Sequence, residues 1–315
     1  MDRMTSPSAR IYALISYPSR KAVVFRRGPS GQVLLISWDL ATDTFERGQW
    51  FKGRIYERRC DLSPSGKYLI YFAATYKEPY YSWTAISKPP YLTALVLWPK
   101  GDGWGGGGLF RTETTIALNH REYEFQMAKG FSWPKSFTKE PLGEHSGWGE
   151  DYPINAMRLI RQKWTCVQQG VAHYDGEKKV QRKLNDTLAW VNQSVEEAEM
   201  LSIRPVFAVY DPIEIWQKKN ARHILEMQTL GWGEKNGSSY VLRFRVLAED
   251  GKQILDLRRA DWADWDKNGE LLFAKGGRIF RLSHPKGGMK AAKELIDLRE
   301  DRFRPLEAPD EFKVW

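Results

Sequence analysis

The chain has 315 residues, of which 42% are hydrophobic and 28% are charged, and its formal net charge is +9. This composition is typical of a globular protein and excludes an intrinsically disordered chain. No run approaches the roughly 20 apolar residues that a membrane-spanning helix requires, and the first apolar run is too short for a signal-peptide core. We therefore expect no membrane segment and a cytoplasmic location.

The cysteine and histidine content predicts neither a disulfide framework nor a metal centre. Cys60 and Cys166 are far apart in the sequence and both lie in stretches that read as strands, so we expect two free thiols. No two of the five histidines have metal-ligand spacing. We expect no cofactor.

Taken in chain order, the first notable feature is the basic character of residues 10–60, which carry ten basic and four acidic side chains. A basic surface attracts anions, so nucleic acid and acidic proteins are candidate partners. Five arginines of this region are candidate binding residues: Arg26, Arg27, Arg54, Arg58 and Arg59.

A strand–turn–strand pattern recurs along the chain. Residues 58–72 align without a gap with residues 261–275, and residues 15–25 form a weaker third copy. The alignment places Asp61 and Asp264 in equivalent positions near a predicted hairpin. Internal repetition of such a unit about every 40 to 50 residues is typical of propeller blades.

The hairpin at residues 62–71, Leu-Ser-Pro-Ser-Gly-Lys-Tyr-Leu-Ile-Tyr, resembles the "SPDGK-hydrophobic" hairpin of TolB-like and WD40-like propellers. Residues 54–64, 89–95 and 98–110 are similar to a group of uncharacterised bacterial proteins. The resemblance implies a hairpin within a propeller blade, and it carries no activity with it.

We therefore predict an all-β, propeller-like fold of about five irregular four-stranded blades in a single domain, 1–315. Blades are expected at about 10–50, 51–111 and 258–300, and residues 112–257 supply two irregular ones. Residues 131–153 read as a loop. Helix content should be low, with one helix at 195–201, where Ser194 and Glu197 form a capping box.

Residues 101–106 match the pattern G-x-G-x-x-G after an apolar strand. Dinucleotide binding requires a helix N-terminus after the glycines, and residues 114–118 read as a strand instead. We expect a loop whose backbone passes close to another part of the chain.

Eight of the fourteen tryptophans fall into two groups. Trp38, Trp98, Trp262 and Trp265 fall at strand positions, so they are expected to be buried between blades. The other four, Trp104, Trp133, Trp148 and Trp232, lie beside glycine, proline or serine and are candidates for an exposed binding surface.

Carboxylates at Glu144, Glu150 and Asp151 accompany aromatic residues in the same part of the chain and are weak candidates for catalysis. Paired carboxylates can act as acid and base on a glycan that aromatic rings hold by stacking, whereas acids in an exposed loop usually only keep it solvated.

These patterns favour a non-enzymatic interaction or scaffold module that binds a macromolecule, with a protein as the first choice of partner. Two alternatives stay open, a glycan-acting or other hydrolytic enzyme and a nucleic-acid or polyanion binder. The sequence predicts neither the partner nor the oligomeric state.

Overall fold

The computed structural model describes residues 9–28, 31–144, 146–169, 214–232 and 240–315. The chain divides into two compact units: unit 1 comprises Met1–Pro7 and Lys163–Ile296, and unit 2 comprises Ser8–Gln162 and Asp297–Trp315. The helix predicted at 195–201 lies outside the described residues. No helix in the described part of the chain is long and apolar enough to cross a membrane.

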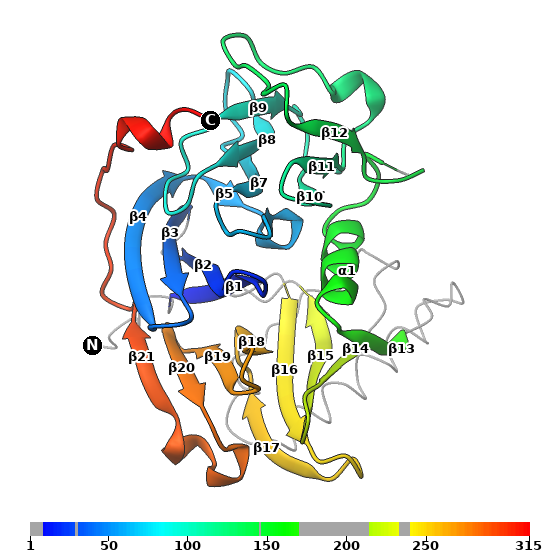
Figure 1. Ribbon diagram of the computed structural model, residues 1–315, viewed down its shortest axis with the longest axis vertical. Helices are drawn as coiled ribbons and strands as arrows, with labels where there is room; N and C mark the ends of the chain where they lie inside the picture. The colour runs from blue at the N-terminus through cyan, green and yellow to red at the C-terminus, as the bar shows by residue number, and fades with distance from the viewer. Residues whose placement is uncertain (1–8, 29–30, 145, 170–213, 233–239) are drawn as a thin grey trace, which may run out of the picture. The chain divides into compact units, whose positions relative to one another are not determined.

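The described strands of unit 2 form three sheets, and the strands within each sheet are close in sequence (Figure 1). All their paired strands are antiparallel except β11 and β12, which are parallel. The first sheet contains β1 (Arg10–Ser16), β2 (Lys21–Arg27), β3 (Gln32–Asp39) and β4 (Thr44–Lys52). The second contains β5 (Arg54–Ile55), β6 (Asp61–Leu62), β7 (Leu69–Ala74), β8 (Ser82–Ser87) and β9 (Val96–Pro99). The third contains β10 (Gly108–Phe110), β11 (Thr115–Leu118) and β12 (Thr138–Pro141).

The described strands of unit 1 form two further sheets. One contains β13 (Thr165–Gln169), β14 (Glu214–Lys219), β15 (Ile224–Trp232), β16 (Tyr240–Leu247) and β17 (Gln253–Arg258). The other contains β18 (Trp262–Trp265), β19 (Leu271–Lys275), β20 (Arg278–Leu282) and β21 (Lys293–Asp297). Because nearly all the regular structure described is antiparallel strand, the all-β prediction is confirmed.

The core of unit 2 lies on both faces of its second sheet. Side chains of a strand alternate between faces, so Leu69, Tyr71 and Ala73 of β7 pack with the first sheet, whereas Ile70 packs with the third. All six residues of β7 are buried. Such a strand reads as a continuous apolar run because neither face meets solvent.

The repeated hairpins predicted from sequence are present. β6 pairs with β7 and β18 pairs with β19, and in each turn a glycine, Gly66 or Gly269, adopts a φ near +75° (75° and 77°). The N–H of each glycine donates to the carbonyl three residues earlier, Ser63 or Asp266. The third copy joins β1 to β2, and Arg20 takes the left-handed conformation there, with a φ of 56°.

Sequence analysis did not predict the helix α1 (Tyr152–Arg161), which begins at the end of the expected loop 131–153. That loop interpretation is also wrong for residues 138–141, which form β12. Pro153 lies in the first turn of α1, where the missing N–H costs nothing. Ile154, Arg158 and Leu159 are buried, and the helix contacts β10 and the 3-10 helix η1 (Glu57–Arg59). This helix was not predicted because it has only 10 residues and follows a glycine-rich stretch.

Candidate functional site

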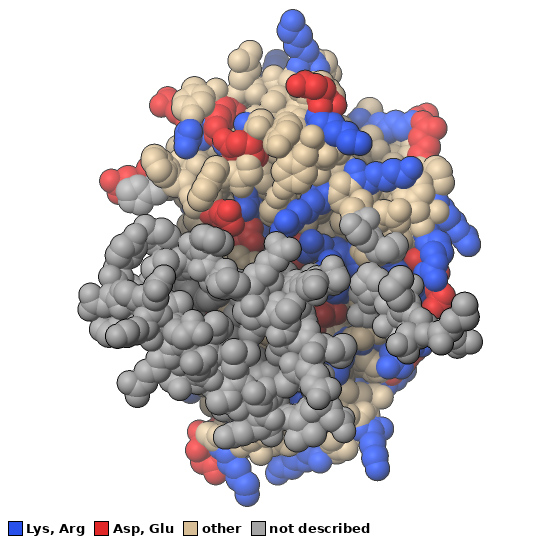
Figure 2. Space-filling view, turned by 180° about the vertical axis from the view of Figure 1, so that it is seen from behind, with Lys and Arg blue, Asp and Glu red and all other residues tan. Residues whose placement is uncertain are grey.

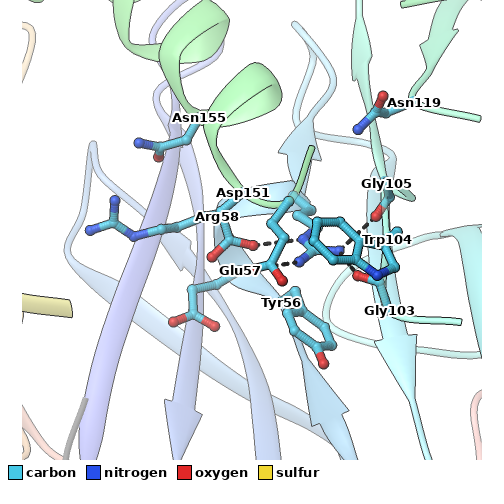
Figure 3. A network of polar contacts seen from close by, with 12 residues as sticks. Tyr56, Glu57, Arg58, Gly103, Trp104, Gly105, Asn119, Asp151 and Asn155 are labelled. Carbon is cyan, nitrogen blue, oxygen red and sulfur yellow. Dashed lines mark hydrogen bonds and ion pairs between the residues drawn. The ribbon is translucent and has the colours of Figure 1, made fainter. Parts of the chain in front are cut away.

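Arg59 joins three parts of unit 2. Its side chain is 1% exposed and comes from the end of η1. Its Nε donates to Oδ1 of Asp151 at 2.6 Å, and its Nη1 donates to the carbonyl oxygens of Gly103 at 2.7 Å and Gly105 at 2.6 Å. Figure 3 shows the Asp151 carboxylate and these two carbonyls converging on one network. The guanidinium therefore fixes η1, the glycine-rich loop and the start of α1 to one another.

Aromatic rings pack on the same guanidinium. The Arg59 Cζ lies 4.6 Å from the ring centre of Tyr56 and 5.1 Å from that of Phe72. The Tyr56 hydroxyl shares a hydrogen bond with that of Tyr76, and burial raises the pKa of Tyr56. Arg54 stacks on Tyr56 as well, with its Cζ 4.4 Å from the ring centre. The Tyr56 and Phe72 rings therefore shield the Arg59 guanidinium from water, while its Nε and Nη1 keep their hydrogen bonds.

The glycine-rich loop needs glycine because its backbone runs against neighbouring atoms. Gly105, Gly106 and Gly107 have φ values of 62°, 79° and 78°, a conformation that side chains disfavour. A Cβ on Gly107 would lie 2.1 Å from the carbonyl oxygen of Arg59. The loop continues into β10 and not into a helix, so it lacks the helix N-terminus that the dinucleotide motif uses.

A second loop, residues 147–149, is fixed beside the first. The N–H of Gly105 donates to the carbonyl of Gly149 at 2.7 Å, and the N–H of Gly147 donates to Oδ1 of Asn119 at 2.8 Å. A Cβ on Gly147 would lie 2.5 Å from the backbone nitrogen of Arg121. The two loops therefore form one backbone assembly that also holds the residues after β11.

This assembly presents three exposed aromatic side chains and an arginine, which we call the aromatic face: Trp104, Arg121, Tyr123 and Trp148. The rings of Trp104, Tyr123 and Trp148 are 59%, 72% and 64% exposed. Arg121 bridges two of them, because its Cζ lies 5.4 Å from the ring centre of Trp148 and its Nη1 donates to the Tyr123 hydroxyl at 2.6 Å. The hydrogen bond to Tyr123 raises the pKa of Arg121.

His120, which precedes Arg121, supports the glycine-rich loop from the interior. Its side chain is fully buried, and its Nε2 lies 2.7 Å from the Thr84 hydroxyl oxygen, which also accepts a hydrogen bond from the N–H of Gly107. Burial lowers the pKa of His120 to about 4, so the ring is neutral near pH 7. In the described part of the chain no cluster of three or more His, Cys, Asp or Glu side chains is arranged to hold a metal ion.

Unit 2 supplies contacts for four predicted binding arginines, Arg26, Arg27, Arg54 and Arg59. Arg26 is 2% exposed and donates to the carbonyls of Leu298 and Arg299 at 3.0 and 3.2 Å. Arg27 donates from Nη1 to both carboxylate oxygens of Glu57, at 2.7 and 2.9 Å. Arg54 and Arg59 pack on Tyr56, and Arg58 is half-buried. On the face shown in Figure 2, the basic side chains are interspersed with acidic ones.

The predicted aromatic residues separate into two environments. Trp104 and Trp148 are exposed and belong to the aromatic face. Trp133 instead packs in an interior cluster, with ring centres 5.5 Å from Trp98 and 5.8 Å from Trp315. Tyr123 and Arg121 were missed, and the only sequence signal for them is an Arg-x-Tyr pair just after β11.

The predicted carboxylates also differ in environment. Asp151 is bound to Arg59, whereas Glu150 is 61% exposed and its Oε2 lies 3.9 Å from Arg59 Nη2. Glu144 is exposed in the loop after β12. Asp151 therefore neutralises a buried cation, which gives this carboxylate a structural role.

Comparison with known proteins leaves the chain without an assigned family. No family model matches it, and no curated protein matches it. Among solved structures it is similar to the uncharacterized protein lmo1340 from Listeria monocytogenes EGD-e, at 11% sequence identity and a TM-score of 0.29. That match covers 93% of this chain and 85% of the other.

Proposed function

We propose that the chain is a non-enzymatic interaction module that binds a protein partner through the aromatic face. The observation that carries the proposal is the exposure of Trp104 and Trp148 on two loops that a backbone hydrogen bond joins. Soluble proteins rarely expose several large apolar side chains together, so a group of exposed aromatic rings on fixed loops indicates a binding surface.

The composition of the aromatic face supports a protein partner. Tryptophan, tyrosine and arginine are the residues most enriched among interface hot spots. Replacing a hot-spot residue by alanine costs about 2 kcal/mol or more of binding free energy. The four side chains of the aromatic face are two tryptophans, one tyrosine and one arginine. Each aromatic ring offers a large contact area, and ordering it on binding costs little conformational entropy because it has few rotamers.

The rigidity of the supporting loops favours binding for a second reason. Ordering loops on association consumes binding free energy, so loops that are already fixed give higher affinity. Here Arg59 holds the carbonyls on both sides of Trp104, and the Gly105–Gly149 hydrogen bond holds the loop that carries Trp148. Little of the aromatic face needs to be ordered when a partner arrives.

The propeller-like architecture belongs to the same proposal. Its support is the succession of sheets, each built from strands close in sequence, and the predicted strand–turn–strand repeats. Propellers present loops around a common face, which suits binding a large partner. The free thiols of Cys60 and Cys166 support a reducing, cytoplasmic setting.

The test measures direct binding of a partner enriched from host extract and then purified. Trp104→Ala and Trp148→Ala should each weaken binding by about 30-fold, which corresponds to about 2 kcal/mol. Ile160→Ala is the matched control, because this side chain is 61% exposed but lies outside the aromatic face. A partner that binds the Trp104→Ala/Trp148→Ala double variant as tightly as the wild type would refute the proposal.

One observation favours nucleic acid as a second candidate partner. Arg121 lies over the exposed ring of Trp148, and the chain carries a net charge of +9. Exposed aromatic rings with arginine can stack single-stranded bases, and such binding weakens steeply with salt. Titration with a fluorescent oligonucleotide at about 50 and 200 mM salt separates the two candidates, since protein binding is less salt-dependent.

A further inference from the structure

The last part of the chain packs along unit 2 without joining a sheet. Residues 298–315 follow β21 and contain one short regular element, the 3-10 helix η6 (Asp310–Phe312). Figure 1 shows this segment beside β4, where Arg47 donates to the Asp301 carboxylate at 3.0 Å. We call residues 298–315 the terminal segment.

Side-chain donors from three places in unit 2 bind carbonyl oxygens of the terminal segment. The donors are a buried arginine of β2, an amide of β4 and an ammonium group after β8. The hydrogen bonds are Arg26 Nε to Leu298 O at 3.0 Å, Gln49 Nε2 to Leu306 O at 3.0 Å, and Lys88 Nζ to Glu311 O at 2.8 Å. Main-chain carbonyls occur in every peptide, so these contacts recognise the backbone and not a particular side chain.

Gln49 is oriented by residues outside the terminal segment. Its Oε1 accepts hydrogen bonds from the N–H of Leu92 at 2.7 Å and from the Thr93 hydroxyl at 3.1 Å. These bonds direct the amide N–H groups toward the terminal segment. Because the orientation depends on Leu92 and Thr93, the donor is positioned before any peptide arrives.

Aromatic anchors supply the side-chain part of the contact. Phe303 packs on Trp50 with ring centres 6.0 Å apart, and Phe312 packs on Tyr91 at 4.5 Å. Trp315 enters the interior cluster, where its ring centre is 5.0 Å from Phe137 and 5.8 Å from both Tyr68 and Trp133. Its indole N–H donates to the carbonyl of Ser132 at 3.0 Å.

Pro305 and Pro309 fit this mode of binding. Proline lacks a backbone N–H and cannot continue a sheet edge, and Pro309 has φ −56° and ψ 156°, close to polyproline II. Side-chain donors for carbonyls, combined with aromatic contacts, are how proline-containing linear peptides are recognised.

We propose that unit 2 carries a peptide-recognition surface, formed around Arg26, Gln49, Lys88, Trp50, Tyr91 and Trp133, that the terminal segment occupies in cis. The partner it fits is a linear, proline-containing peptide of another protein with aromatic residues spaced as in residues 303–315. Covalent attachment gives the terminal segment an effective concentration of about millimolar, so an external peptide competes only when it binds more tightly or is abundant. This surface is separate from the aromatic face, and the inference does not depend on the proposed function.

A cut chain tests the proposal while the Gln49 and Lys88 contacts and the aromatic anchors of the terminal segment stay in place. A specific protease site is inserted between Arg299 and Glu300, which are both exposed and lie in a turn. After cleavage, a fluorescent synthetic peptide of residues 300–315 should exchange with the severed segment while the circular dichroism of the protein stays unchanged. Cleaved protein that unfolds, or that never exchanges its segment, would overturn the proposal, because the segment would then be an integral part of the core.

Variants establish whether the named contacts carry the recognition. The peptide with Phe312→Ala and Trp315→Ala should bind at least tenfold more weakly, and so should the wild-type peptide to cut protein carrying Gln49→Ala and Lys88→Ala. Arg302→Ala in the peptide is the control, because its ion pair with Glu300 is exposed on both sides. If the wild-type peptide, the Phe312→Ala/Trp315→Ala peptide and the Arg302→Ala peptide bind equally well, recognition by the aromatic anchors is refuted. If the inserted site resists cleavage, the uncut Phe312→Ala/Trp315→Ala variant should bind the labelled peptide at least tenfold more tightly than the wild type, and failure to do so counts against the proposal.

Discussion

Arg59 and Asp151, which are 92 residues apart in the sequence, form an ion pair of 2.6 Å whose side chains are 1% and 13% exposed. Removing one member of a buried pair strands the other charge in the interior, which typically costs about 3 to 5 kcal/mol. The same arginine holds two loop carbonyls, so its loss should also release Trp104.

We therefore expect Arg59→Met to lower the free energy of unfolding by about 3 kcal/mol or more. Arg59→Lys should recover only part of this loss, because an ammonium group lacks the planar fork that reaches Asp151 and both carbonyls. Urea unfolding measures the effect. Lys21→Gln is the control, since its pair with Asp39 is exposed and should be worth at most about 1 kcal/mol. Equal losses for the two substitutions would contradict the role assigned to Arg59.

Two glycines of one loop give a matched pair of substitutions. Gly107→Ala should destabilise unit 2 by more than about 2 kcal/mol, because its Cβ would overlap the Arg59 carbonyl and its φ is 78°. Gly103→Ala should be close to neutral, since no atom lies within 4 Å of its Cβ position. Thermal unfolding of both variants tests the explanation of the glycine pattern, and neither wild type nor variants should be stabilised by a dinucleotide.

His120 should make the stability of the protein depend on pH. Its folded pKa of about 4 is below the ordinary value of 6.5, so the unfolded chain binds the proton more readily. The corresponding stabilisation is present above pH 6.5 and is lost as the pH falls through 4, by about 3 kcal/mol in total. Urea midpoints between pH 7 and pH 4 should show this loss in the wild type and a smaller one in His120→Gln. Identical pH profiles would exclude His120 as the cause.

The two thiols should differ in reactivity. Cys60 is fully buried, and burial raises its pKa, which withholds the reactive thiolate. Cys166 is partly exposed in β13, so it should react first with a thiol reagent in the native protein. After denaturation without reductant, both groups should react. A Cys60 that reacts as fast as Cys166 in the folded state would contradict the burial of Cys60.

Local features of the fold were predictable because their causes are local. A turn that needs positive φ favours glycine or a tolerant polar residue, and this places Gly66 and Gly269 correctly at two hairpins. The burial of Trp38, Trp98, Trp262 and Trp265 at strand positions was likewise predictable. The turns differ in one respect that sequence did not reveal, because Asp61 pairs with Ile70 whereas Asp264 pairs with Leu272, one residue closer.

Features that depend on distant residues were not predictable. Arg26 reads as a surface cation, yet its partner Leu298 is 272 residues away in the sequence. Trp133 was expected to be exposed because glycine and serine residues lie just before it in the sequence. In the structure, Trp98 and Trp315 pack against its ring. In both cases a contact between residues far apart in the sequence determines whether the side chain is buried. A single sequence does not show which distant residues will meet.

The equivalent aspartates Asp61 and Asp264 provide a final prediction. Each is buried, accepts a backbone N–H at 2.8 Å and pairs with a cation from another element of its own unit. The cation for Asp61 is Arg161, whose side chain is 42% exposed, and the cation for Asp264 is Lys218, whose side chain is 7% exposed. Water can solvate the Arg161 guanidinium once the Asp61 carboxylate is replaced by a neutral group. The Lys218 ammonium group is much less accessible to water when Asp264 is replaced in the same way.

Asp264→Asn should therefore destabilise the protein more than Asp61→Asn, by about 3 to 5 kcal/mol against about 1 to 3 kcal/mol. A thermal scan should show the larger fall in the unfolding midpoint for Asp264→Asn. Combining Asp264→Asn with Lys218→Met should restore part of the loss, because the double variant no longer buries an ammonium group without its carboxylate. The Arg161→Met substitution should restore little in the Asp61→Asn background, since the exposed guanidinium was already solvated. If the two single variants lose equal stability, exposure of the cation is not what decides the strength of these pairs.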